Sequence, residues 1–276
     1  MRVRFWGVRG SVAVPSERML RYGGNTSCVE VTLDDGTEII LDAGTGIREL
    51  GAARASHTSP QILLTHLHLD HIQGLLFFPP LFDPENEITV YGPAAPGPAL
   101  DQRLARYLSA PLSPVDLREL PARVEFAACP YDEWEVGGAR VRAGLVAHRG
   151  VTLGYRITEG DSSLCYIPDH EPALGRPLAD ADPGWISGIG LAADASALIH
   201  DGQYTAEEYS EHVGWGHSSV SDAVTFARRA EVERLVLFHH DPTHDDDYLD
   251  GLQEDARAEL SADSVSLAAE GMTIGV

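Results

Sequence analysis

Short runs of alternating apolar and polar residues occupy the first third of the chain and predict β-strands joined by turns. Arg2–Trp6 alternates in this way, and Ser27–Leu33 does so up to Asp34-Asp35-Gly36, a sequence typical of a hairpin turn. Gln61–Thr65 is instead predicted to be a short apolar strand, of the kind buried on both faces. Further segments complete this part: strands at 37–41 and 88–91, and a helix at 101–108.

The second half repeats the pattern of strands followed by helices. An amphipathic helix is predicted over Ser219–Ala230, with Ser218 or Ser219 as its N-cap. The other predicted elements are strands at 139–148, 152–157, 164–167, 197–200, 234–238, 265–267 and 272–274, and a helix at 246–260. Two strand-rich halves, each followed by helices, predict two sheets sandwiched between helices in a single domain over residues 1–276.

The overall composition is that of a globular protein. Hydrophobic residues make up 43% of the 276 residues and charged residues 22%, which excludes a disordered or collagen-like chain. No apolar run approaches the ~20 residues that a membrane span needs. The first residues, Met1–Gly7, are typical of a strand and not of a signal peptide. We therefore expect a soluble cytoplasmic protein with no membrane partner.

Charge is strongly unbalanced, with 20 basic and 42 acidic residues and a net charge of -22. Every basic residue is an arginine, so reactions that need a lysine, such as Schiff-base formation, are excluded. The acidity argues against a broad nucleic-acid interface, which needs a basic face. It is also compatible with a salt-rich cytoplasm. The three cysteines lack disulfide or metal spacing and are predicted to be buried thiols.

The strongest chemical signal is the segment His66-Leu67-His68-Leu69-Asp70-His71. It holds four potential metal ligands in six residues, directly after the predicted buried strand. Neutral imidazole and carboxylate suit zinc, manganese or iron. Three histidines and an aspartate are seldom packed so closely for structural reasons, and the segment therefore predicts a metal site.

Other ligands are expected where later strands end. His148, Asp169 and His239 each follow an apolar run, and strand ends at one edge of a sheet present their loops together. His239 and His240 are adjacent, and adjacent residues of a strand point to opposite sides, so only one of them can face the metals. We favour His239 because it directly follows the apolar strand. His170 and His244 are interpreted as loop or supporting residues.

This combination of motifs resembles the metallo-β-lactamase superfamily. The resemblance rests on His-x-His-x-Asp-His, on the preceding turn Asp42-Ala43-Gly44, and on the later His, Asp and His. It covers nearly the whole chain and implies a four-layer αββα sandwich with two divalent metal ions at one edge of the sheets. The ions are expected to be Zn²⁺, with Mn²⁺ or Fe as alternatives. The resemblance implies His66, His68 and His148 at one metal, Asp70, His71 and His239 at the other, and Asp169 as the bridge.

Two further segments resemble the ribonuclease Z and small phosphodiesterase branch of that superfamily. They are Leu198–Thr205 and the sequence Gly214-Trp215-Gly216-His217-Ser218-Ser219. By resemblance, His217 donates a proton to the leaving alkoxide and Asp201 orients that histidine. Aspartate stands here where the branch usually has glutamate, and the shorter side chain changes its reach. Asp70 is counted with His217 and Asp201 among the catalytic residues.

The predicted reaction is hydrolysis of a phosphodiester by a metal-bound hydroxide that attacks phosphorus in line. Ribonuclease Z enzymes carry a basic arm for transfer RNA, but the corresponding region, 72–146, has no basic cluster. A small phosphodiester or nucleotide-derived substrate is therefore expected, and a large structured nucleic acid is not. An exposed Phe77-Phe78 patch would permit a homodimer.

Two other functions are compatible with the same motifs. The hydroxide could attack a carbonyl carbon in a lactone, a thioester or a β-lactam, although His217 and Asp201 would then have no clear task. A non-catalytic, metal-binding sensor that kept the fold is the second alternative. The complete set of predicted ligands argues against it.

Overall fold

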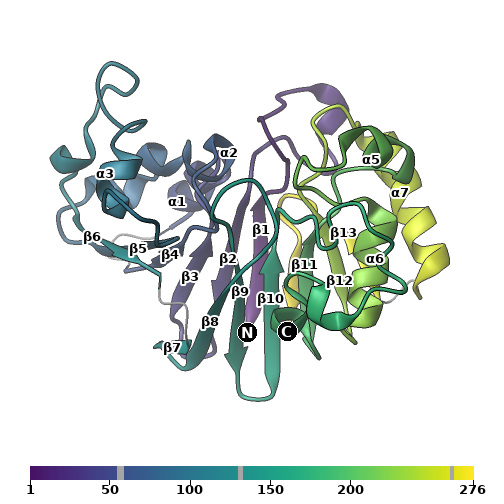
Figure 1. Ribbon diagram of the computed structural model, residues 1–276. Coiled ribbons are helices and arrows are strands. Elements are labelled where there is room, and N and C mark those ends of the chain that lie inside the picture. The colour runs from purple at the N-terminus through teal and green to yellow at the C-terminus, as the bar shows by residue number, and fades with distance from the viewer. Residues whose placement is uncertain (55–58, 130–132, 262–263) are drawn as a thin grey trace.

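Two β-sheets pack face to face at the centre of the molecule (Figure 1). The computed structural model describes residues 1–54, 59–129, 133–261 and 264–276. In order across the first sheet, the strands are β14 (Thr273–Gly275), β1 (Arg2–Gly7), β2 (Cys28–Thr32), β3 (Glu38–Leu41), β4 (Gln61–Leu63), β5 (Glu87–Gly92) and β6 (Arg123–Ala128). In the second they are β13 (Val265–Leu267), β12 (Leu235–Phe238), β11 (Ala197–Asp201), β10 (Ser162–Ile167), β9 (Leu153–Glu159), β8 (Ala139–Leu145) and β7 (Glu133–Val136).

Helices cover the outer face of each sheet. On the first sheet these are α1 (Ile47–Ala52), α2 (Leu69–Ile72) and α3 (Leu100–Leu104), which share one apolar cluster with β3, β4 and β5. On the second sheet, α4 (Ile189–Ala192), α6 (Val220–Arg229) and α7 (Asp246–Glu259) share another, and α5 (Ala206–His212) lies on the same side of the molecule (Figure 1). A third cluster fills the space between the sheets. The predicted αββα sandwich is therefore confirmed.

Single 3₁₀ turns occupy several connections. They span Glu17–Met19, Leu75–Phe77, Pro79–Phe82, Leu117–Glu119 and Pro183–Trp185. The two turns around Phe78 bury its ring completely, while Phe77 is 63% exposed. The predicted Phe77-Phe78 patch is therefore wrong for Phe78, and only Phe77 of that pair faces solvent.

Most predicted strands are present, with shifts of one or two residues at their ends. The strand predicted over 139–148 is an exception, because β8 ends at Leu145 and His148 lies in the following loop. The predicted helix over 101–108 is shorter, as α3. Two strands, β6 and β7, were not predicted, although Arg-Val-Glu-Phe in β6 and Glu-Trp-Glu-Val in β7 alternate charged and apolar residues. Ser219 is the N-cap of α6 and accepts a hydrogen bond from the Asp222 amide.

Strand direction brings the ends of β4, β10, β11 and β12 to one edge of the sandwich. β3, β4 and β5 are mutually parallel, as are β10, β11 and β12. Two hydrogen bonds join the sheets at this edge: the Leu153 amide donates to the Thr65 carbonyl at 2.9 Å, and the Tyr155 hydroxyl donates to the Leu64 carbonyl at 2.7 Å. The two chain ends lie side by side, away from this edge (Figure 1).

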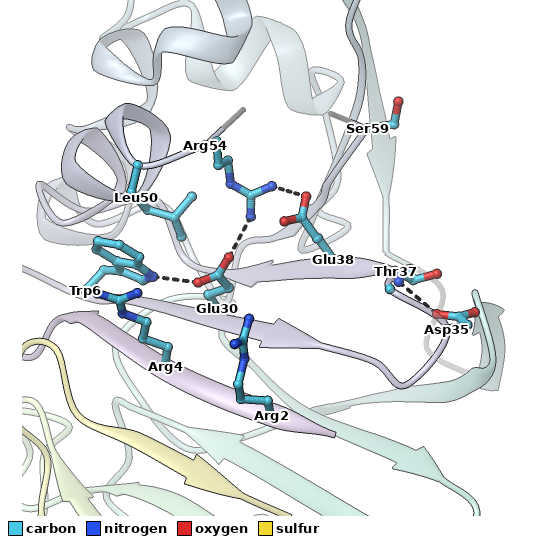
Figure 2. Close-up of a pocket in the computed structure, with 12 residues that line it drawn as sticks. Arg2, Arg4, Trp6, Glu30, Asp35, Thr37, Glu38, Leu50, Arg54 and Ser59 are labelled. Atoms are coloured by element: carbon cyan, nitrogen blue, oxygen red, sulfur yellow. Dashed lines mark hydrogen bonds and ion pairs between the residues drawn. The ribbon is translucent and has the colours of Figure 1, made fainter. Parts of the chain in front are cut away.

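Figure 2 shows the pocket on the outer face of the first sheet, beside α1. Arg54, just beyond α1, forms ion pairs with Glu30 on β2, at 3.2 Å, and with Glu38 on β3. The Trp6 indole donates to the other oxygen of Glu30 at 2.9 Å. These pairs hold the C-terminal end of α1 against the first sheet. Across the described ranges, no helix is both long and apolar enough to span a membrane.

Candidate metal centre

Seven predicted ligands meet at the shared edge of the two sheets. His66 and His68 lie in the turn from β4 into α2, and Asp70 and His71 lie in α2 itself. His148, Asp169 and His239 follow β8, β10 and β12. Their ligating atoms gather in two groups: one with His66, His68, His148 and Asp169, the other with Asp70, His71 and His239. A third group joins Asp169 and His239 with His217.

Asp169 stands between the two groups and turns one carboxylate oxygen toward each. Its Oδ2 lies 3.6 Å from His66 Nε2 and 3.5 Å from His148 Nε2. Its Oδ1 lies 3.1 Å from His71 Nε2 and 3.3 Å from His239 Nε2. A carboxylate in this position can bridge two cations, one on each side.

Asp70 and His68 complete the two groups. Asp70 Oδ2 lies 3.2 Å from His239 Nε2 and 3.4 Å from His71 Nε2, on the side of Asp169 Oδ1. His68 offers Nδ1, which is 3.3 Å from His148 Nε2. The Ser11 amide donates to Asp70 Oδ2 at 2.8 Å and holds the carboxylate in place.

Hydrogen bonds on the far side of the rings fix which nitrogen faces the cluster. The Nδ1 atoms of His148 and His239 donate to the Gly216 carbonyl, at 2.6 Å, and to Gln203 Oε1, at 3.1 Å. His71 Nδ1 donates to Asp42 Oδ2 at 2.9 Å. A neutral imidazole that donates from Nδ1 has a lone pair on Nε2. As neutral rings, His71, His148 and His239 therefore turn Nε2 lone pairs toward carboxylate oxygens, and a bound cation or a proton offsets the repulsion. Burial opposes a proton on His71, but Asp169, Asp70 and Asp42 raise the pKa of this ring well above its usual value.

Unpaired buried atoms show that the cluster fits a divalent metal. His66 Nε2, His71 Nε2 and Asp169 Oδ1 are all buried, with no hydrogen-bond partner among the described residues. Buried polar atoms are rarely left in that state, since each costs about 1–3 kcal/mol. Nitrogen and carboxylate donors at these spacings are those of a zinc, manganese or iron site.

The electrostatics of the cluster favour ionised carboxylates. Burial works against the charged form, but His239, His71 and His66 hold the pKa of Asp169 well below its ordinary value. Burial lowers the pKa of His66 well below its usual range, which keeps this imidazole neutral. Ionised carboxylates and neutral imidazoles are the forms that bind metal.

Asp42 supports the cluster from beneath. It is fully buried at the end of β3, with φ of 61°, and its oxygens accept from the Thr65 amide at 2.8 Å and from the Tyr166 hydroxyl at 2.9 Å. Its bond to His71 fixes the tautomer of that ring. Tyr166 was not singled out from the sequence. It lies in the apolar run before Asp169, and a tyrosine in a buried strand gives no sequence signal of a polar contact.

His217 and Asp201 form a pair beside the cluster. His217 Nδ1 donates to Asp201 Oδ2 at 2.7 Å, so the shorter aspartate does reach. The His217 ring stacks on His239, with centroids 5.0 Å apart, and meets His148 edge-on at 4.9 Å. Burial opposes the imidazolium, but Asp201 raises the pKa of His217 to about 9. Asp201 is itself held by the amides of His170 and Gln203.

Glu171 positions the loop that carries His217, and sequence reasoning missed it. Its carboxylate accepts from the amides of Gly214 and Gly216, each at 2.8 Å. Gly216 has φ of +94°, and a Cβ there would lie 2.5 Å from His148 Nδ1. The available signal was the acidic residue directly after Asp169-His170.

Among the described residues, five other histidines lie outside the cluster: His170, His200, His212, His240 and His244. His240 points away and donates from Nε2 to the Ala268 carbonyl at 2.8 Å. The backbone of His239 has φ of 62°, so this residue leaves the strand in a turn, and simple strand alternation does not explain why the two rings separate. His170 bonds to His200 at 2.9 Å, and His244 to Glu208 at 2.9 Å.

Comparison with known proteins gives the family. A model of the beta-lactamase superfamily domain matches residues 37–240. The chain belongs to this superfamily. It is 30% identical over 263 residues to the ribonuclease Z of Methanopyrus kandleri, with 86% of each chain covered.

Solved structures of this superfamily fold superpose over the whole chain. A diphosphatase of the PhnP family has a TM-score of 0.71 and 19% identity, covering 100% of this chain and 97% of its own. Zn²⁺-bound PqqB from Methylobacterium extorquens has a TM-score of 0.72 and 20% identity, with 100% of both chains covered. The superfamily resemblance drawn from the sequence motifs is thus confirmed.

Proposed function

We propose that the protein is a metal-dependent hydrolase of phosphodiesters, with His217 and Asp201 protonating the leaving group. The observation that carries this proposal is the pair itself. The His217 imidazole is held by the Asp201 carboxylate and contacts His148, in one group of predicted ligands, and His239, in the other. Carbonyl hydrolysis with a good leaving group has no need for such a pair.

Two Zn²⁺ ions are the proposed cofactors. His66, His68 and His148 would hold one, Asp70, His71 and His239 the other, and Asp169 would contact both. When bound, such ions supply a hydroxide nucleophile at neutral pH and offset negative charge on the phosphoryl oxygens. The Zn²⁺-bound PqqB neighbour supports the choice of zinc, as does the number of imidazole donors.

His217 acts on the leaving oxygen. Asp201 holds its Nδ1, so Nε2 is the nitrogen available to the substrate. A proton on Nε2 passes to the departing alkoxide, and Asp201 stabilises the imidazolium until that transfer. The Ser11 amide holds the Asp70 carboxylate in the cluster, where Asp70 would contribute to the reaction by fixing the ion beside His71 and His239.

A small diester is the proposed substrate. The relative named ribonuclease Z supports cleavage of a phosphodiester bond. The net charge of -22 disfavours a long polyanion, because each added phosphate increases the repulsion. We also propose a homodimer that forms through the exposed surface around Phe77. Phe82, near Phe77, is 43% exposed and extends this apolar surface.

Hydrolysis of bis(p-nitrophenyl) phosphate, with zinc, manganese or iron supplied, tests the proposal. We expect turnover that Asp169→Ala abolishes and that Asp247→Ala, a matched change at a 90% exposed carboxylate, leaves unchanged. His217→Ala should cost little with this good leaving group and about 10²–10⁴-fold with a poor one such as a dinucleoside phosphate. Absence of diester turnover with all three metals, together with cleavage of a lactone or thioester, would overturn the proposal.

A further inference from the structure

We propose that a pocket beside His217 binds the leaving-group side of the substrate, and that this group is an uncharged nucleoside. This inference rests on the proposed function and names its substrate class. The pocket has a volume of about 360 Å³ and lies between the Ser11 loop, α5 and the loop after β12. A volume of roughly 300 Å³ or more is typical of sites for small ligands.

His217 connects the pocket to the metal cluster. Its ring lines the pocket and also contacts His148 and His239. If His217 protonates the leaving oxygen, whatever is attached to that oxygen must lie on the His217 side of the phosphorus. The pocket is the space available there, so its lining determines which leaving groups the enzyme accepts.

Aromatic rings form one wall of the pocket. Tyr204 and His212 stack with centroids 4.7 Å apart at 17°, so each covers a face of the other. Trp215 meets His212 edge-on, also at 4.7 Å, and is 54% exposed. An indole with an open face beside a catalytic histidine is suited to stacking against a planar ring, and such stacking contributes about 1–3 kcal/mol per base.

Carboxylates and hydroxyls form the remainder of the lining. Asp241 accepts from Gln203 Nε2 at 3.2 Å and from Thr243, and Glu208 accepts from His244 at 2.9 Å. Both carboxylates retain acceptor capacity for ribose hydroxyls or exocyclic amines. Among the described residues, no arginine lines this pocket. A further phosphate on the leaving group would meet two negative charges, which favours a nucleoside over a nucleotide chain.

A quaternary ammonium group is the main competitor, since aromatic rings and carboxylates also bind such cations. A cage for a cation needs several open ring faces around one point. Here Tyr204 is 5% exposed and stacked against His212, which leaves Trp215 as the ring with an open face. One open face suits a flat base better than a spherical cation.

Calorimetric titration of the metal-loaded protein with adenosine, ribose and choline tests the inference directly. Adenosine should bind and the other two should not. Trp215→Ala should weaken adenosine binding about tenfold or more, as expected for one lost stacking contact. Trp185→Ala, a matched change at an indole that is 79% exposed in another pocket, should leave the affinity unchanged.

Kinetics with a dinucleoside phosphate separate this inference from the proposed function. Trp215→Ala should lower kcat/KM about tenfold, and Trp185→Ala should not. Turnover of diesters without adenosine binding, or with binding that Trp215→Ala does not change, would overturn the pocket and leave the function standing. Binding of choline in place of adenosine would overturn the nucleoside assignment. Adenosine binding that depends on Trp215, without turnover of any diester, would overturn the reaction and keep the nucleoside site.

Discussion

The Tyr166 hydroxyl donates a hydrogen bond of 2.9 Å to Asp42 Oδ2, and so connects β10 of the second sheet to the end of β3 in the first. The same oxygen accepts from His71 Nδ1. Tyr166 and Asp42 are both fully buried. The orientation of one predicted metal ligand therefore depends on the packing of the two sheets against each other.

Tyr166→Phe should weaken zinc binding. The change removes one donor to Asp42 and loosens the carboxylate that holds His71, and changes to such supporting residues typically cost about 10–100-fold in metal affinity. We expect a loss at the lower end, because Thr65 still donates to Asp42. Competition with a chromogenic chelator measures the affinity. Tyr22→Phe is the matched control, because that hydroxyl donates to Asp250 at 2.9 Å outside the cluster. An equal loss in the two variants would contradict this account.

Gly216→Ala should reduce activity by displacing His148. A methyl group at this position would lie 2.5 Å from His148 Nδ1, and the φ of +94° is unfavourable for alanine. We expect at least a tenfold loss of kcat and a lower zinc content by atomic absorption. Gly251→Ala in α7 is the control, since no described atom outside the adjoining helix backbone lies within 4 Å of its added methyl group. Full activity in Gly216→Ala would show that the loop adjusts without moving His148.

Much of the fold and most of the cluster follow from local sequence pattern. Ile62–Leu64 and Leu235–Phe238 are continuous apolar runs, and polar residues at their ends fall at one edge because the strands are parallel within their sheets. The motif from His66 to His71 is compact enough to be recognised without any tertiary information. These are cases in which short-range pattern and burial agree.

The supporting residues that were not predicted from the sequence act through long-range contacts. Tyr166 and Glu171 act through partners 124 and 43–45 residues away, and neither sits in a motif. Strand β6 is half-buried and was missed, although its first four residues, Arg-Val-Glu-Phe, alternate charged and apolar side chains. Phe78 was assigned to the surface, but the turns on either side bury it.

Stability should fall at acid pH in a way that depends on His200. Burial lowers the pKa of this histidine, and its Nδ1 donates to the Asp201 carbonyl at 2.7 Å. The unfolded chain binds a proton near pH 6.5 that the folded protein does not, so the free energy of unfolding decreases below that pH. His200→Gln should remove up to about 1.4 kcal/mol of the decrease between pH 8 and pH 5.5.

Urea unfolding of the metal-free protein in EDTA measures this difference, because metal dissociation at low pH then makes no contribution. The other histidines are common to both proteins and cancel in the comparison. Parallel pH profiles for wild type and His200→Gln would mean that His200 is protonated in the folded state.

Chelation of the metals should lower the thermal stability of the protein. An ion that binds only the folded state stabilises it by RT ln(1 + [L]/Kd), or about 4 kcal/mol at a thousandfold excess over Kd. For a chain of this size we expect a fall in Tm of roughly 10 °C on adding EDTA. Recovery should require two equivalents of zinc in the wild type and in Asp247→Ala. In Asp169→Ala, which lacks the carboxylate between the two groups, we expect at most one equivalent to bind and only part of the Tm to return. A Tm that chelation does not change, with no zinc retained after dialysis, would mean that the seven residues cluster for structural reasons alone.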